Sequence, residues 1–460
     1  MVEKGAGRPS RDQRAVCVDF GSTFTKASLV DLREGRVLGR AEHPTTIDTD
    51  LLDGYDACLA ELPGAGDAPV LACSSAGGGL RITVVGNEEL VTAEAGRRVA
   101  LSSGGRVVAV VATGTPVAEG LAAEPDVVLL TGGTDGGNTE AITSAAQDLV
   151  SSGWTGPVVV AGNVDARPEV SRILRDVPHV LADNVVPAIG VLAPDSARAA
   201  IREMFLAHVI GGKHLSARDE FVAMVRGATP DVVLAGVEVL AEVAGDVVVV
   251  DIGGATTDVH SVVKLDPALR DDSALASSGA GQGLSREVVA EMPVSRTVEG
   301  DLGMRWSALS TVEAAGLEDL RAAAARRTDE PGFVPSTDAE HDEDERLAAA
   351  AAGLALRRHA GRARVVVSPE GRVVERTGKD LREVRLLVGS GGVLRHGRPG
   401  VAERVLGPST GAGLEGGWQL PERPSVVVDV DYVLAAVGLL APEHPEAAYR
   451  LARTLLDPGA

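Results

Sequence analysis

The sequence contains very few aromatic residues, which make up 2% of its 460 positions. Its cores must therefore be built from Val, Leu, Ile and Ala, and this favours buried parallel strands and alanine-rich helices. It also argues against the aromatic platforms on which single-stranded nucleic acids stack. Positive charge is scarce too, because 44 Lys and Arg face 65 Asp and Glu and the net charge is −21. Such an acidic chain is a poor candidate for binding nucleic acid or an anionic membrane.

Cysteine is equally sparse, with only Cys17, Cys58 and Cys73. An odd and small number indicates a reducing compartment and not a disulfide framework. Cys17 falls within an apolar strand pattern, so we expect it in a core. No apolar run approaches the roughly 18 residues that indicate a membrane span. The polar residues 1–14 lack the features of a signal peptide and predict a disordered arm. We therefore expect a soluble, cytoplasmic protein.

Two segments of the chain resemble each other. Residues 16–27 are VCVDFGSTFTKA, and residues 248–259 are VVVDIGGATTDV. Each predicts a buried strand that ends in an acid, Asp19 or Asp251, followed by a turn of small and hydroxylated residues and a second strand. Glycine turns offer backbone donors to phosphate oxygens, and carboxylates hold Mg²⁺, mostly through its waters. Two such turns that face each other would clamp the phosphates and the metal ion of a nucleotide.

We call these segments the first acidic turn and the second acidic turn. Besides Asp19, the first offers Gly21, Ser22, Thr23, Thr25 and Lys26. Besides Asp251, the second offers Gly253, Gly254, Ala255, Thr256 and Thr257. A third turn begins the segment GSGGVLRH at 389–396 and lacks an acid, which suits close approach of an uncharged group such as adenosine; its residues are Gly389, Ser390, Gly391 and Gly392. Lys26 either touches phosphate or lies on the second strand and points outward.

The segments DFGSTFTK, DIGGATTD and LLVGSGG resemble the phosphate-1, phosphate-2 and adenosine motifs of the ATPase superfamily of actin, heat-shock chaperones and sugar kinases. The resemblance implies an α/β, two-lobed actin-like fold built on duplicated ribonuclease-H-like domains, with a helical insertion. It further implies that ATP or ADP binds with Mg²⁺ between Asp19 and Asp251. The threonines of the two acidic turns would line the phosphates, and the third turn would pass under the nucleoside.

Members of this superfamily also have helices that link the lobes. Residues 182–193, ADNVVPAIGVLA, resemble the first of these helices, and residues 432–440, YVLAAVGLL, resemble the second. Many members place Glu, Gln or Asp in the first helix to position a water, and the matching position here is Asn184. Asn orients a water but cannot take its proton, so the resemblance implies a slow, switch-like ATPase. The alternative is that Asn184 only caps the helix.

The resemblance and the sequence texture together predict the domain organisation. Short βα repeats over 107–180 predict an inserted parallel sheet. We expect a first lobe at residues 15–190 that contains this inserted subdomain, and a helical connection at 191–245. A second lobe at 246–440, with a helical and acidic insertion near 313–360, and a tail at 441–460 would follow. Residues 328–346 are highly charged and predict an exposed loop between helices.

Several segments resemble one branch of the superfamily, the MutL/GlmL accessory proteins of adenosylcobalamin-dependent glutamate mutase. They include GGTDGGN at 132–138, GNVDAR at 162–167, HVIGGKHLS at 208–216 and VEGDLGMRWSA at 298–308. The resemblance implies a chaperone-like protein that uses ATP to release damaged cobalamin from a mutase. Its implied partners are the mutase subunits, without nucleic acid or membrane, and formation of a homo-oligomer stays open.

Other functions are weighed beside this one. A small-molecule kinase would need an acidic base near the γ-phosphate, for which Asp135 is available. A scaffold that uses nucleotide as an assembly switch and a hydantoinase-like hydrolase are further alternatives, although no metal-ligand cluster supports the latter. His208 and His214 have poor spacing for a metal site, and His396 is expected to end a helix. We expect Arg305 and Trp306 to pack in a core, although a partner-facing role is conceivable.

Overall fold

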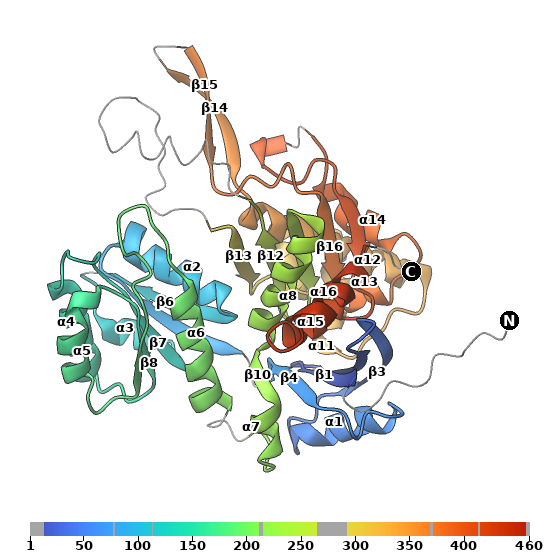
Figure 1. Cartoon of the computed structure of the whole chain (residues 1–460). Coiled ribbons are helices and arrows are strands. Elements are labelled where there is room, and N and C mark those ends of the chain that lie inside the picture. The colour runs from blue at the N-terminus through green and yellow to red at the C-terminus, as the bar shows by residue number, and fades with distance from the viewer. Residues whose placement is uncertain are drawn as a thin grey trace.

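Two five-stranded sheets with the same strand order form the body of the structure (Figure 1). The structure is a computed structural model that describes residues 13–76, 79–112, 114–210, 215–264, 292–368, 371–412 and 415–456. In order across the first sheet, the strands are β3 (Arg36–Pro44), β2 (Phe24–Asp31), β1 (Arg14–Phe20), β4 (Val70–Ser74) and β10 (Val225–Ala228). Across the second sheet they are β13 (Val294–Glu299), β12 (Thr257–Val262), β11 (Val247–Ile252), β16 (Leu386–Ser390) and β17 (Ser425–Val428).

The pairing within the two sheets is equivalent. In each, the first three strands in chain order pair antiparallel, and the last two pair in parallel beside the first strand. Asp19 lies opposite Lys26 in the first hairpin, and Asp251 lies opposite Asp258 in the second. The continuous valine runs suit strands that are covered on both faces. The predicted α/β fold built on a duplicated unit is confirmed.

A third sheet is inserted after β4 and is drawn at the left of Figure 1 in blue to green. Its strands are all parallel, which confirms the parallel sheet predicted from the βα repeats. In order across this inserted sheet they are β6 (Gly105–Val111), β5 (Leu80–Val85), β7 (Val127–Leu130), β8 (Val158–Val160) and β9 (His179–Leu181). Its accompanying helices are α2 (Glu94–Ser102), α3 (Val117–Leu121), α4 (Glu140–Ser151), α5 (Arg167–Ile173) and α6 (Asp195–Met204).

Helix α8 (Thr229–Ala244) joins the last strand of the first sheet to the first strand of the second. It packs against α15 (Val433–Leu440), which follows β17 and confirms the helix predicted at 432–440. A Cβ atom on Gly236 would overlap the carbonyl of Leu434, and one on Gly438 would overlap that of Val232. Only glycine therefore permits this close helix crossing. The predicted linking helix over 182–193 is wrong, because these residues form an irregular segment and the linking helix is α8.

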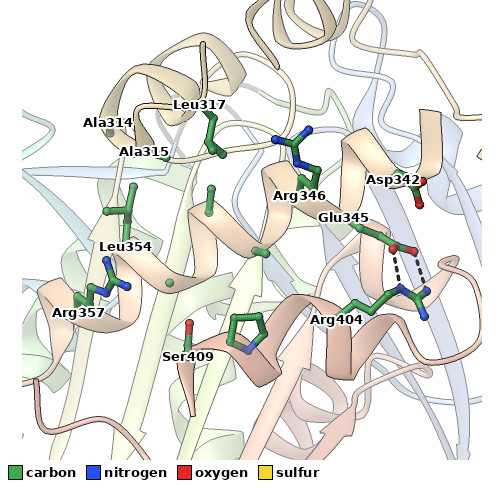
Figure 2. A pocket seen from close by; sticks show the side chains of 14 residues that line it. Ala314, Ala315, Leu317, Asp342, Glu345, Arg346, Leu354, Arg357, Arg404 and Ser409 are labelled. Atoms are coloured by element: carbon green, nitrogen blue, oxygen red, sulfur yellow. Dashed lines mark hydrogen bonds and ion pairs between the residues drawn. The ribbon is translucent and has the colours of Figure 1, made fainter. Parts of the chain in front are cut away.

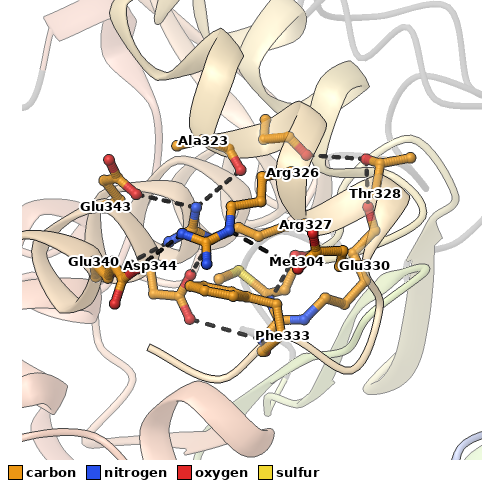
Figure 3. A network of polar contacts seen from close by, with 12 residues as sticks. Met304, Ala323, Arg326, Arg327, Thr328, Glu330, Phe333, Glu340, Glu343 and Asp344 are labelled. Atoms are coloured by element: carbon orange, nitrogen blue, oxygen red, sulfur yellow. Dashed lines mark hydrogen bonds and ion pairs between the residues drawn. The ribbon is translucent and has the colours of Figure 1, made fainter. Parts of the chain in front are cut away.

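Two other predictions need correction in the described residues. The helical connection predicted over 191–245 also contains a strand, because β10 lies within it and completes the first sheet. Residues 338–346 do not form a loop but begin α12 (Asp338–His359), where Thr337 and Glu340 make a reciprocal capping box. Figure 3 shows why this charged stretch is ordered: the fully buried Arg327 pairs with Asp344 and Glu343 and donates to the carbonyl of Ala323.

The remaining described elements cover the sheets. Helix α1 (Leu51–Ala60) and α16 (Pro445–Arg453) contact the first sheet, while α12 and α14 (Val401–Leu406) contact the second. A two-stranded hairpin of β14 (Arg362–Ser368) and β15 (Gly371–Thr377) projects from the body in Figure 1. Short helices complete the chain: α7 (Glu220–Met224), α10 (Ala308–Ala315), α11 (Arg321–Asp329) and α13 (Gly392–Arg395). None of the described helices combines the length and apolar character that a membrane crossing requires.

Candidate functional site

Asp19 lies at the end of β1, where its side chain is 10% exposed. Thr229, the first residue of α8, donates from Oγ1 to Asp19 Oδ1 over 2.6 Å. The Cys73 thiol, on the parallel neighbour β4, lies 3.6 Å from the same oxygen. Lys26 Nζ lies 3.8 Å from Asp19 Oδ2. The first sheet, the linking helix and the first acidic turn therefore meet at one carboxylate.

The first acidic turn closes tightly behind Asp19. The backbone N–H of Gly21 donates to the carbonyl of Phe24 over 3.1 Å. Ser22 and Thr23 are exposed at the tip, where their donors are accessible to a ligand. Thr25 is fully buried, and its hydroxyl lies 3.4 Å from that of Thr45. The predicted phosphate contacts thus remain accessible at Ser22 and Thr23, whereas Thr25 lies behind the turn.

Asp251 occupies the equivalent position at the end of β11 and is half-buried. Burial and the neighbouring Asp258 raise the pKa of its carboxyl to about 6, while Lys26 and the Ser390 hydroxyl act to lower it. Asp19 also acts to raise it, so the two acids influence each other across the two sheets. A carboxylate in this setting favours a neighbouring cation.

The second acidic turn also closes on itself, with the Gly253 N–H donating to the carbonyl of Thr256 over 2.9 Å. Ala255 is exposed at the tip, Gly254 and Thr256 are half-buried, and Thr257 is fully buried without a hydrogen-bond partner for its hydroxyl. A Cβ on Gly254 would lie 2.9 Å from the ring of Trp306, which is 50% exposed. The prediction that Trp306 packs in the core is wrong, because its ring covers the turn from the solvent side.

Lys26 connects the two lobes. Its ammonium lies 3.6 Å from the ring centroid of Tyr432, the residue that precedes α15. Burial acts to lower the pKa of Lys26, but Tyr432, Asp19 and Asp251 together raise it above its ordinary value. The Tyr432 backbone adopts the left-handed region with φ of 55°, which a non-glycine residue rarely adopts. The cation is therefore held between both acids and the start of a linking helix.

The third turn lies beside the second acidic turn, because Ser390 is in register with Asp251 in the parallel pair of β11 and β16. Gly391 has φ of 107°, and a Cβ there would overlap the carbonyl of Ile252. Glycine is thus required for the close approach of these two chain segments. Gly389 is buried beneath, and Gly392 is exposed with open space around it. The predicted adenosine contact at Gly392 is sterically accessible.

Asn184 lies elsewhere, among the loops at the carboxyl end of the inserted sheet. Its amide nitrogen donates to the Gly133 carbonyl over 2.9 Å and to Asp135 Oδ1 over 2.8 Å. Its oxygen accepts from the backbone N–H of Val186. The catalytic assignment of Asn184 rested on a linking helix at 182–193, and that helix is absent from this part of the described chain. Asp135, the base considered for a kinase, belongs to the same loop network and also accepts from Val164 N–H.

The sequence reasoning did not find two residues that the structure brings to the site: Thr229 and Tyr432. Thr229 carries a usable signal, because it precedes Pro230 and an apolar helical pattern, which is typical of a helix start. Tyr432 contacts Lys26, which is distant in the sequence, so its position depends on the tertiary structure.

The other candidate residues lie away from the acidic turns or act differently. Arg305 donates to the carbonyls of Pro331 and Phe333, so its guanidinium organises a loop. His396 ends α13 as predicted and is exposed. His208 belongs to a π-helical segment over Phe205–Ile210, and His214 lies outside the described residues.

Two cavities are prominent on the surface. The larger, of about 740 Å³, lies over α12 between α10 and α14, and Figure 2 shows Arg404 bound to Glu345 at its edge. No predicted site residue lines this cavity. A second cavity of about 310 Å³ is lined by Lys26, Tyr432 and Arg395. It therefore adjoins the cation that connects the two lobes.

Comparisons with known proteins assign the chain to a family. A family model described as MutL protein matches residues 15–456. Protein MutL from Clostridium tetanomorphum is 36% identical over 468 residues, covering 95% of this chain and 98% of the relative. Among solved structures, nucleotide-free acetone carboxylase has 15% identity and a TM-score of 0.40, with coverage of 94% of this chain and 70% of the other. The ethanolamine utilization protein EutJ from Carboxydothermus hydrogenoformans has 12% identity and a TM-score of 0.29, with coverage of 96% of this chain and 91% of the other. At these TM-scores neither solved structure adds to what the strand order shows.

Proposed function

The chain belongs to the MutL protein family, and from this premise we propose that it is an ATP-binding, slowly ATP-hydrolysing accessory protein that reactivates an adenosylcobalamin-dependent mutase of the glutamate mutase type. ATP or ADP binds with Mg²⁺ between the two acidic turns. Opening driven by ATP releases damaged cobalamin from the mutase and admits intact coenzyme.

The paired acids carry this proposal. Asp19 and Asp251 end equivalent strands of duplicated sheets, and they share Lys26 between them. Polyphosphate binding requires cationic and hydrogen-bonding groups around the phosphates and carboxylates for the metal ion. Lys26 and the exposed donors of Ser22, Thr23 and the second acidic turn meet the first requirement. Asp19 and Asp251 meet the second.

The residues present fit a magnesium ion bound together with a nucleotide. The described residues contain no group of three or more His, Cys, Asp or Glu side chains that could hold a metal by itself. Mg²⁺ characteristically uses one or two protein carboxylates together with waters and substrate phosphates. Asp251 lies in an excess of negative charge from Asp258 and Asp19, which a divalent cation would neutralise. When bound, the ion would neutralise charge on the transferred phosphoryl group.

The chain's own groups account for slow hydrolysis. Thr229 offers a hydroxyl beside Asp19 at the start of the linking helix. A hydroxyl orients a water but is a poor acceptor for its proton. With Asp19 and Asp251 assigned to the metal ion, Thr229 would orient the water without taking its proton, as expected for a nucleotide switch. The link from the site to α8 and α15 provides the route by which nucleotide occupancy would alter the arrangement of the lobes.

Nucleotide binding is tested by titrating the purified protein with ATP in the presence and absence of Mg²⁺, using isothermal calorimetry. We expect Asp19→Asn and Asp251→Asn to lose the Mg²⁺-dependent part of the affinity while keeping the circular dichroism spectrum. Asp135→Asn is the matched control and should bind normally, because Asp135 belongs to the inserted-sheet loops. Normal Mg²⁺-dependent binding by both site variants would overturn the site assignment.

Reactivation is tested separately with mutase that has been inactivated by binding cyanocobalamin in place of its coenzyme. Added protein with Mg²⁺ and ATP should release the bound cyanocobalamin and restore activity once adenosylcobalamin is supplied. The Asp251→Asn variant should not. If wild-type protein binds ATP but leaves cobalamin exchange unchanged in glutamate mutase and in related carbon-skeleton mutases, the reactivation role is refuted and nucleotide binding stands.

A further inference from the structure

Arg296 lies on β13, where it connects the second acidic turn to the inserted sheet. Its side chain is 4% exposed. Nε and Nη2 donate to Asp258 Oδ1 over 3.0 and 2.6 Å. Nη1 donates to the carbonyls of Leu101 and Gly105 over 3.3 and 3.2 Å. One buried guanidinium therefore binds the second lobe and the inserted sheet at the same time.

Asp258 carries this contact into the second acidic turn. Its other oxygen, Oδ2, accepts from Thr256 Oγ1 over 3.2 Å. Asp258 also lies opposite Asp251 in the hairpin. A movement of Thr256 or a change of charge at Asp251 would thus act directly on the carboxylate that holds Arg296.

The turn that accepts from Arg296 also packs against the start of α8, the helix that contacts Asp19. Leu101 is in the last turn of α2, and Gly105 begins β6. Between them Gly104 has φ of 78°, and a Cβ there would lie 2.6 Å from the backbone nitrogen of Asp231, in the first turn of α8. Thr229, two residues earlier, donates to Asp19. The turn at 102–105 therefore lies between α8, whose Thr229 contacts Asp19, and Arg296, which contacts Asp258 opposite Asp251.

A second ion pair anchors the inserted region to α8. Arg202, on α6, donates from Nε to Asp231 Oδ2 over 2.6 Å, and the Asp231 side chain is 2% exposed. Helix α6 follows the inserted sheet in the chain, so the inserted region is held by Asp231 at the linking helix and by Arg296 at the second lobe. Removing one partner of a buried ion pair leaves an uncompensated charge, so each pair favours a defined position of the inserted sheet.

We propose that Arg296 is a positioning residue that couples nucleotide occupancy of the acidic turns to the placement of the inserted sheet, through Asp258 on one side and the carbonyls of Leu101 and Gly105 on the other. This inference rests on the proposed function, since it requires a nucleotide at the acidic turns. The position of the inserted sheet then depends on whether a nucleotide occupies the acidic turns. The exposed loops of that sheet change position with it, and so does the surface that they offer to a partner.

Hydrogen–deuterium exchange measured by mass spectrometry tests the coupling. In the wild-type protein, saturating Mg²⁺ and ATP should change amide exchange over residues 94–111 by about fivefold or more, the lower end of typical allosteric coupling. In Arg296→Ala this change should disappear, although calorimetry still shows ATP binding. Arg358→Ala is the matched control, because Arg358 pairs with Glu299 and Asp301 in the same lobe without contacting the inserted sheet.

Arg296→Lys separates coupling from simple stabilisation. Lysine keeps the charge beside Asp258 but lacks the planar fork that reaches a carboxylate and two carbonyls together. We expect this variant to fold and to keep the KM for ATP, while the exchange response over 94–111 stays lost and kcat changes. Restoration of the full response by lysine would overturn the role assigned to the contacts with the Leu101 and Gly105 carbonyls, because the charge beside Asp258 would then be sufficient.

The outcomes for wild-type protein separate the two proposals. If it binds Mg²⁺ and ATP but residues 94–111 exchange at an unchanged rate, the coupling is refuted and nucleotide binding stands. If it does not bind ATP at all, the proposed function fails first and the coupling falls with it. A response that persists in both Arg296 variants would also refute the coupling, because the signal would then travel by another route.

Discussion

Replacing Asp251 with Asn should stabilise the ligand-free protein while it removes magnesium-dependent nucleotide binding. Burial and Asp258 raise the pKa of this carboxyl from its ordinary value of 3.8 to about 6. One pKa unit corresponds to about 1.4 kcal/mol, so ionised Asp251 destabilises the fold by about 3 kcal/mol at neutral pH. Asn has the same shape without the charge and retains an acceptor for the Ser390 hydroxyl. The expected gain therefore approaches ~3 kcal/mol.

The pH dependence of the free energy of unfolding follows from the direction of the Asp251 pKa shift. The folded state binds the Asp251 proton more tightly than the unfolded chain does, so protonation stabilises the fold as the pH falls through about 6. The gain is complete below 3.8, the ordinary pKa. The advantage of Asp251→Asn over the wild-type protein should hence be full above pH 6 and vanish near pH 4. Burial and Arg296 lower the pKa of the buried His260 to about 3. Because His260 is present in both proteins, its contribution to the pH dependence cancels when the two are compared.

Urea unfolding at pH 7.5 and at pH 4.5 measures the difference in free energy of unfolding. Asp258→Asn is the matched control, because the same chemical change one strand away should destabilise. It would leave the buried Arg296 without its carboxylate, and breaking a buried ion pair typically costs about 3–5 kcal/mol. If Asp251→Asn is less stable than the wild-type protein at pH 7.5, or if the difference does not shrink at pH 4.5, the electrostatic account of the site is refuted.

Three further predictions concern the packing around the site. Gly438→Ala should destabilise by about 1–3 kcal/mol in urea unfolding, because its Cβ would overlap the Val232 carbonyl at the helix crossing; an unchanged midpoint would contradict this close packing. Arg327→Ala should cost about 3–5 kcal/mol by the same assay, since it leaves buried Asp344 with only its longer contact of 3.8 Å to Arg305, and a loss below ~1 kcal/mol would indicate that the pair is solvated. Trp306, which lies over the second acidic turn, should change its fluorescence when ATP binds; the change should be absent in Trp306→Phe, and its persistence would assign it to another tryptophan.

The sequence predicted the elements whose signals are local. The βα repeats over 107–180 alternate apolar runs with turn residues, and the structure contains the parallel sheet that they predict. Strand β10 was missed, because VRGA is short and its pairing with β4 depends on residues about 150 positions away. The start of α12 was mistaken for a loop although Thr337 and Glu340 have the spacing of a capping box. In that case the charge of the stretch outweighed the local signal in our interpretation.

The site was predictable in part for the same reason. Asp19 and Asp251 could be located because the motif repeats along the chain, and a repeat is visible without knowledge of the fold. Asn184 was misplaced because ADNVVPAIG combines a capping residue with apolar positions, whereas Pro187 and Gly190 favour an irregular path. Thr229, which contacts Asp19, and Tyr432, which contacts Lys26, lie outside the motifs and are brought to the site only by the packing of α8 and α15.

The two halves of the site differ most where they are structurally equivalent. Lys26 and Asp258 occupy the same register position opposite the two acids, so the first acidic turn carries its own cation and the second carries an additional carboxylate. That carboxylate is held by Arg296, which also binds the inserted sheet. A ligand cation would consequently be drawn toward Asp251, while Lys26 could turn from the acids toward phosphate. A duplicated fold thus gives an asymmetric pair of turns, in which the first carries a cation beside its acid and the second is linked to the inserted sheet through Arg296.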